Sequence, residues 1–485
     1  MPEVVLTGDD LTTAQLLAVA RDGATARFHP SAVERMRLAN ESIGHVLDRG
    51  EPVYGLTTGV GAHKKVSVAD EERDEFNRLL LPSHAVGFGP DAPAEVVRAT
   101  LLRLANQFAK GTAGVRPELA QRLLDALAEP VPARVRMLGS VGESDLAPMA
   151  DLACGVLGQL RPVGKETLAL INNNAFSTAI AALALADCRR LAGSLEAAAA
   201  LDLEAFGANL TPLHRRAVEV RPFPGSAAAR DHIAGLLDGS GLWQTGAARN
   251  LQDPLSFRCV VTVAGALRDA LEHAERIMAI ELNASQENPI HVSEEDRYIS
   301  VGNTDVATTA ATIDYLRIAL APAITSAAER TLKLLQTFWS GLPLGLAARD
   351  GIPDDALSEL GVVGAAIAGE ARLLAQPVSF EVVTSTIAEG IEDRMTFAPL
   401  AARRLAEMVA LGERMCAIEL AVAAQAFDLR RPPAPGAGVA AVHRRVRELV
   451  PFTAAGQPPP GDLEPLRALV HGGGAEPPLD TGGGV

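Results

Sequence analysis

The fold class is decided by two stretches, VTVAGALRDALEHAERIMAIELN at residues 261–283 and TTAATIDYLRIALAPAITSAAERTLKLLQTFWSGL at residues 308–342. Both have a helical pattern, and both are longer than the usual helix of a globular protein, which has about 10 to 14 residues. Helices of this length are typical of the rods of a bundle. The sequence therefore predicts a mainly α-helical protein with a long central helical bundle and polar loops.

The composition supports this fold class. The chain has 485 residues, of which 48% are hydrophobic but only 4% aromatic, so its apolar content is mostly Ala, Leu and Val. Such residues suit helices that pack through small and medium side chains, and a chain of this length can bury a large core. A disordered or collagen-like chain is excluded.

Three regions are expected along the chain, the same number that its length suggests at about 150 residues per domain. Residues 1–200 are a loop-rich helical region, residues 201–430 hold the central bundle, and residues 431–485 hold a C-terminal helix and a tail rich in Pro and Gly. We expect residues 472–485 to be disordered.

Charge and cysteine usage restrict the partners. Lys plus Arg is 44 and Asp plus Glu is 59, a net charge of −15 without a basic run, which argues against nucleic acid. Four scattered cysteines, without the spacing of a metal site, indicate reduced thiols and no metal: Cys154, Cys188, Cys259 and Cys416. The first ten residues have no secretory signal pattern, and the apolar stretch from Leu168 to Ala186 is interrupted by three asparagines. We expect a buried helix there, no membrane partner and a cytoplasmic location.

Polar segments interrupt the helical pattern at six places, where a rigid scaffold commonly positions chemistry. They are 54–61, 139–148, 171–174, 252–258, 302–305 and 389–394. One such loop would be read as a mere connection, but six suggest a site.

The motifs in these loops resemble those of the histidine and phenylalanine ammonia-lyase family. They occur in the order YGLTTGVG, PSHAVG, RLANQFAKGTAG, GSVGESDLAPMA, ALINNNAFST, NLQDPLSFRC, ASQENP, VGNTDV and EGIEDRMTF, from about Leu11 to Arg430. The resemblance implies a helical fold with a central bundle. It also implies a homotetramer whose active sites combine three subunits and act on a small-molecule substrate.

The family's electrophile, methylidene-imidazolone, is the cofactor that the resemblance puts in question. It forms from consecutive Ala-Ser-Gly, whereas this chain has Glu143-Ser144-Asp145 in a loop that is one residue shorter. Ring closure needs the amide nitrogen of the third residue to attack the carbonyl two residues back, a sharp fold that glycine permits because it lacks Cβ. We therefore expect that the electrophile does not form and that the chain has no cofactor. Ordinary deamination would then lose many tenfold factors in rate, each worth about 1.36 kcal/mol.

Other family positions are retained, apart from a tyrosine that Leu255 replaces. The resemblance makes Tyr54 the base and Arg258 the partner of the substrate carboxylate, a task that suits a guanidinium. It implies that the amide side chains of Asn172, Gln252 and Asn303 line the site. It also implies that His84 and Glu392 contact the imidazole ring of a histidine-type substrate. Thr304 lies where the family has an aromatic residue, and Asp305 follows it. These predicted site residues also have structural readings, a loop anchor for Tyr54 and an interhelical ion pair for Arg258.

Three functions remain open at this point. The first is an enzyme without the electrophile that performs elimination, isomerisation or cyclisation, with Tyr54 as base and Glu143 or Glu392 as acid. Ser144 is counted with the catalytic residues of this predicted site because it holds the place of the electrophile's serine. The second is a conventional ammonia-lyase whose unusual triad matures after all. The third is an inactive binding or scaffolding relative.

Overall fold

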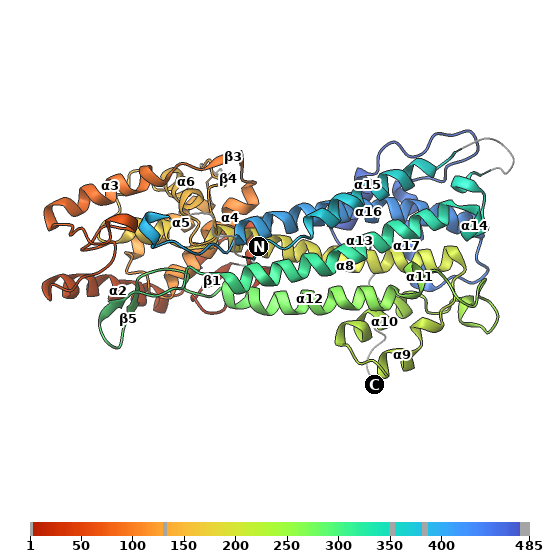
Figure 1. Cartoon of the computed structure of the whole chain (residues 1–485), viewed down its shortest axis with the longest axis horizontal. Coiled ribbons are helices and arrows are strands. Elements are labelled where there is room, and N and C mark those ends of the chain that lie inside the picture. The colour runs from red at the N-terminus through yellow and green to blue at the C-terminus, as the bar shows by residue number, and fades with distance from the viewer. Residues whose placement is uncertain (1–2, 130–132, 349–354, 381–386, 476–485) are drawn as a thin grey trace. The chain divides into compact units, whose positions relative to one another are not determined.

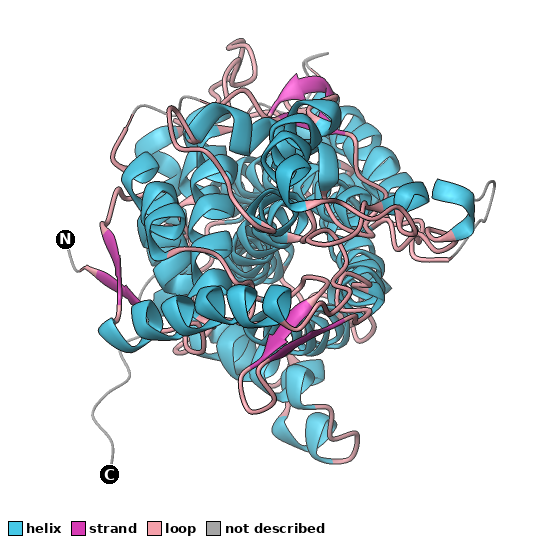
Figure 2. Cartoon of the chain, turned by 90° about the vertical axis from the view of Figure 1, so that its left-hand side faces the viewer, coloured by secondary structure: helices cyan, strands magenta, loops and turns pink. Residues whose placement is uncertain are grey.

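The structure, a computed structural model, describes residues 3–129, 133–348, 355–380 and 387–475. It is mainly helical, which confirms the predicted fold class (Figure 1; Figure 2). The strands among the described residues are short and form two-stranded sheets. β1 (Val4–Leu6) pairs with β2 (Ala26–Phe28) in parallel, whereas β3 (Phe88–Asp91) with β4 (Arg136–Leu138) and β5 (Ile290–Val292) with β6 (Arg297–Ile299) are antiparallel.

The chain divides into two compact units, each built from three separate stretches. Unit 1 contains residues 1–184, 275–314 and 377–403, and unit 2 contains residues 185–274, 315–376 and 404–485. The units do not follow the three sequential regions expected from the sequence, and those regions stay a prediction.

Unit 1 contains the shorter helices of the N-terminal half. They are α1 (Thr13–Ala20), α2 (Pro30–Asp48), α3 (Arg73–His84), α4 (Ala94–Ala109), α5 (Pro117–Leu127), α6 (Leu146–Val156) and α7 (Glu166–Ile171). α1 begins with a capping box in which Thr12 and Gln15 satisfy each other's backbone amides, as the threonine pair before this helix suggests. α4 is buried along almost its whole length and forms the centre of this unit.

The long helices expected for a bundle are present. They are α8 (Ala175–Phe206), α12 (Val260–Glu281), α13 (Ala307–Leu335) and α16 (Ala398–Arg430). The prediction of one helix over residues 308–342 is wrong at its C-terminal end. Gln336 takes an extended backbone conformation that ends α13, and a separate short helix, α14 (Thr337–Ser340), follows it.

Within unit 2 the helices pack closely. A Cβ at Gly412 of α16 would lie 2.5 Å from Leu191 of α8 and 3.2 Å from Ile324 of α13, so the absence of a side chain lets the three helices approach. The smaller helices of this unit are α9 (Arg215–Glu219), α10 (Pro224–Leu236), α11 (Leu255–Arg258), α15 (Ser358–Leu374), α17 (Ala437–Leu449) and α18 (Glu464–His471).

The apolar stretch between Leu168 and Ala186 forms part of α7 and α8. Residues 166–206 are long and apolar enough to cross a membrane, but 94% of their most apolar window is buried inside the protein. This stretch is therefore a core helix, as the asparagine interruption predicted.

The expected tail is packed at its start. Arg445 donates a hydrogen bond to the carbonyl of Gly474, and Ala475 is buried. The expectation of disorder is therefore wrong for residues 472–475, because these contacts hold the backbone. Residues 476–485 lie outside the described part of the chain.

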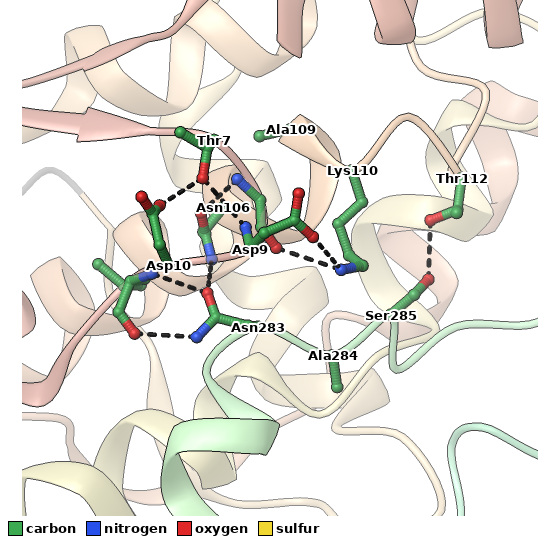
Figure 3. Close-up of polar contacts among 12 residues, drawn as sticks. Thr7, Asp9, Asp10, Asn106, Ala109, Lys110, Thr112, Asn283, Ala284 and Ser285 are labelled. Carbon is green, nitrogen blue, oxygen red and sulfur yellow. Dashed lines mark hydrogen bonds and ion pairs between the residues drawn. The ribbon is translucent and has the colours of Figure 1, made fainter.

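Polar contacts anchor the segment that follows α12 (Figure 3). Asn106 of α4 donates to the side chain of Asn283 at 3.0 Å, and Thr112 and Ser285 are joined through their hydroxyls at 2.8 Å. Lys110 pairs with Asp9 beside them. These contacts fix the start of a segment that continues into the site described next.

Candidate active site

Tyr54 lies in a turn of the loop that follows α2. Its hydroxyl accepts a hydrogen bond from the backbone N–H of Gly61 at 2.8 Å. The next residue, Gly55, has φ +72°, and a Cβ there would lie 2.2 Å from a methyl group of Leu168, so only glycine fits. Burial raises the pKa of Tyr54, and the charge of Glu392 raises it further. Tyr54 is therefore held in one place as a neutral phenol at neutral pH.

Two cavities of unit 1 meet at Tyr54. One has a volume of about 410 Å³ and the other about 680 Å³, and both are lined by Tyr54, Asn172 and Glu392. Residues more than 300 positions apart in the sequence thus lie at one site.

His84 and Glu392 interact electrostatically at this site. His84 Nδ1 lies 2.8 Å from the carbonyl of Leu80, one turn earlier in α3, which leaves Nε2 as the nitrogen available to a ligand. Burial raises the pKa of the Glu392 carboxyl, and His84 opposes this rise. The backbone of Glu392 pairs with Ile387 across a turn that contains the left-handed residues Ala388 and Glu389.

The loop from 139 to 145 connects β4 to α6, and its backbone bonds to the backbone of other segments. Glu143 forms an antiparallel bridge with Asp305, and the amide of Asp145 donates to the carbonyl of Asn173 at 2.7 Å. Ser144 has φ +80°, an uncommon conformation for a residue with a side chain. The segment expected to be loop as far as Pro148 is wrong at its end, since α6 begins at Leu146.

Asp145 ties this loop to α8. Its carboxylate accepts hydrogen bonds from the hydroxyl of Ser140 at 2.8 Å and from the amide and hydroxyl of Ser177 at 2.8 and 2.9 Å. Complete burial raises its pKa to about 6, although these hydrogen bonds act in the opposite direction.

Ser144 bonds to the triple-asparagine segment. Its hydroxyl donates to Asn172 Oδ1 at 2.6 Å, and Asn172 Nδ2 donates to the carbonyl of Asn288 at 2.7 Å. Asn173 and Asn174 bond to backbone carbonyls of Ala169 and Gly142. The amide nitrogens of these side chains are therefore satisfied by the protein, which lowers the cost of burying them, whereas Asn174 Oδ1 is buried without a hydrogen-bond partner.

The segment after β6 supplies the opposite wall. Thr304 and Asp305 line the smaller cavity, and Asp305 pairs with Arg394 at 2.8 Å. Asn303 is not among the lining residues, and its amide donates to the carbonyl of Ser285.

Gln252 and Arg258 belong to unit 2. The Arg258 guanidinium donates to Gln252 Oε1 at 2.5 Å, and Leu255 between them is exposed. Their role at the site stays a prediction from the family resemblance.

Sequence reasoning assigned no role to several polar residues that line the cavities, His63, Asp393 and Arg394 among them. His63 lies in the short 3-10 helix Gly61–His63 and lines the larger cavity, while Asp393 lines the smaller one. His63 lies just after the matched motif of Tyr54, and Asp393 lies within the matched motif of Glu392. That proximity is the signal that was available. Within the described residues, no group of three or more His, Cys, Asp or Glu side chains has the arrangement of a metal site.

Comparisons with known proteins find relatives that match nearly the whole chain. Residues 11–163 and 158–448 match the family described as aromatic amino acid lyase. A histidine ammonia-lyase of Anaeromyxobacter sp. (strain K) is 33% identical, over 98% of this chain and 100% of that protein. The ergothioneine-degrading enzyme ergothionase from Treponema denticola, solved with desmethyl-ergothioneine sulfonic acid, is 25% identical with a TM-score of 0.89, over 98% of this chain and 99% of that one.

Tyrosine aminomutase from Streptomyces globisporus is also 25% identical, with a TM-score of 0.91 over 98% of both chains. Relatives with different reaction names thus share this fold, so the fold leaves the reaction open. The extent of the matches, together with the motifs that surround Tyr54, places this chain in the aromatic amino acid lyase family.

Proposed function

We propose that this chain is an ammonia-lyase-like enzyme that eliminates an amine without methylidene-imidazolone, with Tyr54 as the base. The observation that carries the proposal is the loop at Glu143-Ser144-Asp145. The residues expected to form the ring are engaged elsewhere, since the Asp145 amide donates to Asn173 and the Glu143 backbone pairs with Asp305. A side chain on the third residue adds steric hindrance to closure.

The elimination balances without a covalent adduct. Tyr54 Oη, as phenolate, takes the β-proton, and the C–H electron pair forms the Cα=Cβ bond. The Cα–N bond breaks, and its electron pair leaves with the nitrogen as a neutral amine. Such a reaction suits a substrate with an acidic β-proton or a good leaving group, because no electrophile assists.

The other predicted site residues have assigned places in this proposal. His84 and Glu392 bind a polar ring such as imidazole, since both line the larger cavity. Asn172, Thr304 and Asn303 belong to the substrate side of the site, while Gln252 and Arg258 hold the substrate carboxylate from a neighbouring subunit of a homotetramer. Histidine and histidine-derived betaines are the substrates to test first, because the relatives include histidine ammonia-lyase and ergothionase.

Intact mass and one substitution test the proposal. We expect the purified chain to have the mass of the unmodified sequence, whereas maturation of the electrophile would remove two waters. We expect Ser144→Ala to keep elimination within about tenfold of the unaltered enzyme, because a hydrogen bond to Asn172 is worth only about 1 kcal/mol. Tyr54→Phe is the matched inactive variant.

The assay follows the ultraviolet absorbance of the conjugated product from histidine, its trimethylated betaine and ergothioneine. A mass lower by two waters, or abolition of activity by Ser144→Ala, would return the conventional ammonia-lyase to first place. Absence of turnover of every substrate would favour the inactive relative.

A further inference from the structure

Unit 1 contains a third cavity, called here the α3–α6 pocket, which is distinct from the two cavities at Tyr54. Its volume is about 480 Å³, within the range of about 300–1,000 Å³ that is usual for small-molecule sites. Its walls are one face of α3, the end of α6 and the loop that follows α6, and the two helices pack against each other (Figure 1). None of the predicted active-site residues lines it.

The helix α3 forms a wall of both the α3–α6 pocket and the larger cavity at Tyr54. Residues at a spacing of three and four positions, which share one face of the helix, line the pocket: Asp74, Asn77, Arg78 and Leu81. Residues of the opposite face line the larger cavity: Phe76, Leu80 and His84. A ligand in the α3–α6 pocket is therefore separated from the active site by the body of a helix.

Most of the pocket wall is hydrocarbon. It is contributed by Leu81 and Pro82 of α3, by Ala153 of α6, and by Leu157 and Leu160 after that helix. An apolar group that enters such a pocket leaves water, which favours binding. Small-molecule sites commonly combine walls of this kind with a few polar groups that orient the ligand.

Asn77 is a polar group that points to a ligand. It lines the pocket and is only 2% exposed. Its Nδ2 donates to the carbonyls of Arg73 at 3.0 Å and Gly164 at 2.8 Å, so both amide hydrogens are used and Oδ1 is the remaining acceptor. Within the described part of the chain, no donor bonds to Oδ1. Because a buried acceptor without a partner is costly, an N–H or O–H group of a ligand would bind there favourably.

The charged residues of the pocket favour an anion. Arg161 accepts a hydrogen bond from Arg116 through its backbone carbonyl, but its guanidinium makes no hydrogen bond or ion pair with any described residue. Arg78 adds a second cation, which pairs with the exposed Glu75, and Asp74 is the carboxylate of the lining. The lining thus has a net positive charge in a chain whose net charge is −15. A guanidinium suits a carboxylate ligand because it can donate two parallel hydrogen bonds.

We propose that the α3–α6 pocket binds a small carboxylate that has an apolar body and an N–H or O–H group at its far end. The carboxylate pairs with Arg161, the apolar body lies against Leu81 and Leu157, and the donor bonds to Asn77 Oδ1. This site goes beyond the proposed elimination, since its ligand is bound without any covalent step and without contact to Tyr54.

Three matched probes test the chemistry of the ligand. Indole-3-propionate has a carboxylate, an apolar ring and one N–H group. Its primary amide lacks the charge, and its N-methyl derivative lacks the donor. By calorimetry with the full-length protein, we expect each change to weaken binding at least about tenfold. Absence of binding by indole-3-propionate, or equal affinity of the three probes, would overturn the proposal.

Substitutions distinguish this pocket from the active site. Arg161→Met should weaken the binding of indole-3-propionate about tenfold, because the carboxylate loses its cation. Arg37→Met, at an exposed position of α2 in the same unit, should leave the affinity unchanged. His84→Asn changes the larger cavity at Tyr54 and should also leave the affinity unchanged. A loss with His84→Asn as large as that with Arg161→Met would place the ligand in the active site and overturn the proposal.

Cys154 provides a measurement that needs no substitution. It is exposed and lines the pocket, whereas Cys259 of unit 2 is partly exposed and lies outside the lining. Indole-3-propionate at about ten times its Kd should slow the alkylation of Cys154 by N-ethylmaleimide about tenfold, because the fraction of empty pocket falls by that factor. The rate at Cys259 should stay the same, and mass spectrometry of the two peptides measures both rates. An unchanged rate at Cys154 would overturn the proposal. None of these measurements needs turnover, so their failure is distinct from failure of the proposed function.

Discussion

Both units bury charge, but they do so in different ways. In unit 2, Arg330 lies 2.8 Å from Asp202 and 2.5 Å from Glu419, and all three side chains are at most 4% exposed. In unit 1, the carboxylate of Glu392 lines two cavities beside Tyr54 and His84, and no hydrogen bond to it is present among the described residues.

The difference separates charge that serves the fold from charge that serves a ligand. A buried ion pair with its partner in place is satisfied, and removal of one member leaves an uncompensated charge. A carboxylate on a cavity wall keeps its capacity for a new partner. Substitutions in the two places should therefore affect different properties, activity in unit 1 and folding stability in unit 2.

Tyr54→Phe should give the largest effect on activity. Loss of a general base costs about 10² to 10⁴ in rate, and we expect the loss in kcat with little change in KM or melting temperature. Steady-state kinetics and thermal unfolding measure both. Tyr315→Phe, at an exposed position of α13 in unit 2, is the control that should keep full activity. Retention of more than a tenth of the activity by Tyr54→Phe would contradict its role as base.

Arg330→Met should give the largest loss of stability. It leaves Asp202 and Glu419 buried without their cation, and breaking such a pair costs about 3–5 kcal/mol. The matched control is Arg215→Met, which removes an exposed pair with Glu219 in the same unit and should cost about 0–1 kcal/mol. Urea unfolding of the two variants measures the difference, and equal losses would show that burial is not the cause.

Sequence reasoning predicted the long helices because their apolar patterns extend over several turns. It placed one helix over residues 308–342, and the break at Gln336 was missed because glutamine favours helix and nothing in its type indicates an extended backbone. The local pattern of apolar residues does not contain the information that decides this break.

The site could be predicted only in part. Tyr54, His84 and Glu392 are far apart in sequence, so their meeting at one place came from the family resemblance and not from periodicity. The left-handed Ser144 and the bridge between Glu143 and Asp305 depend on tertiary contacts and were not predicted. His63 was passed over because it lies outside the matched motifs, and Asp393 because the resemblance gives no role to that position of its motif.

Asp145→Asn should change the pH dependence of stability. The folded-state pKa of Asp145 is raised to about 6, above the ordinary 3.8 of an aspartate carboxyl. Its contribution is therefore complete below about pH 4 and is lost as pH rises through 6, because the native state must then hold a buried charge. At about 1.36 kcal/mol per unit, the loss is about 3 kcal/mol.

Urea unfolding between pH 4 and 7 tests this sign. The stability of the unaltered protein relative to Asp145→Asn should fall over that range. Asp296→Asn is a control of opposite sign, measured between about pH 2 and 4, because the Ser42 and Arg49 side chains lower the Asp296 pKa to about 2 and its contribution is lost as pH falls through that value. A constant difference for Asp145→Asn would mean that this carboxyl does not titrate on folding.

Glu392→Gln should give the smallest effect and the sharpest test of the cavity charge. The amide keeps the shape and one hydrogen-bonding oxygen, so we expect kcat/KM at its optimum to fall by about fivefold to tenfold, or about 1 kcal/mol. Because the Glu392 charge raises the pKa of Tyr54, its removal should move to lower pH the limb on which kcat/KM rises as Tyr54 ionises. Glu389→Gln, three residues earlier and absent from the lining of both cavities, should leave the profile in place. The same shift in both variants would show that Glu392 acts only as one of several charges on this loop. The distinction between charge that serves a ligand and charge that serves the fold would then fail for Glu392.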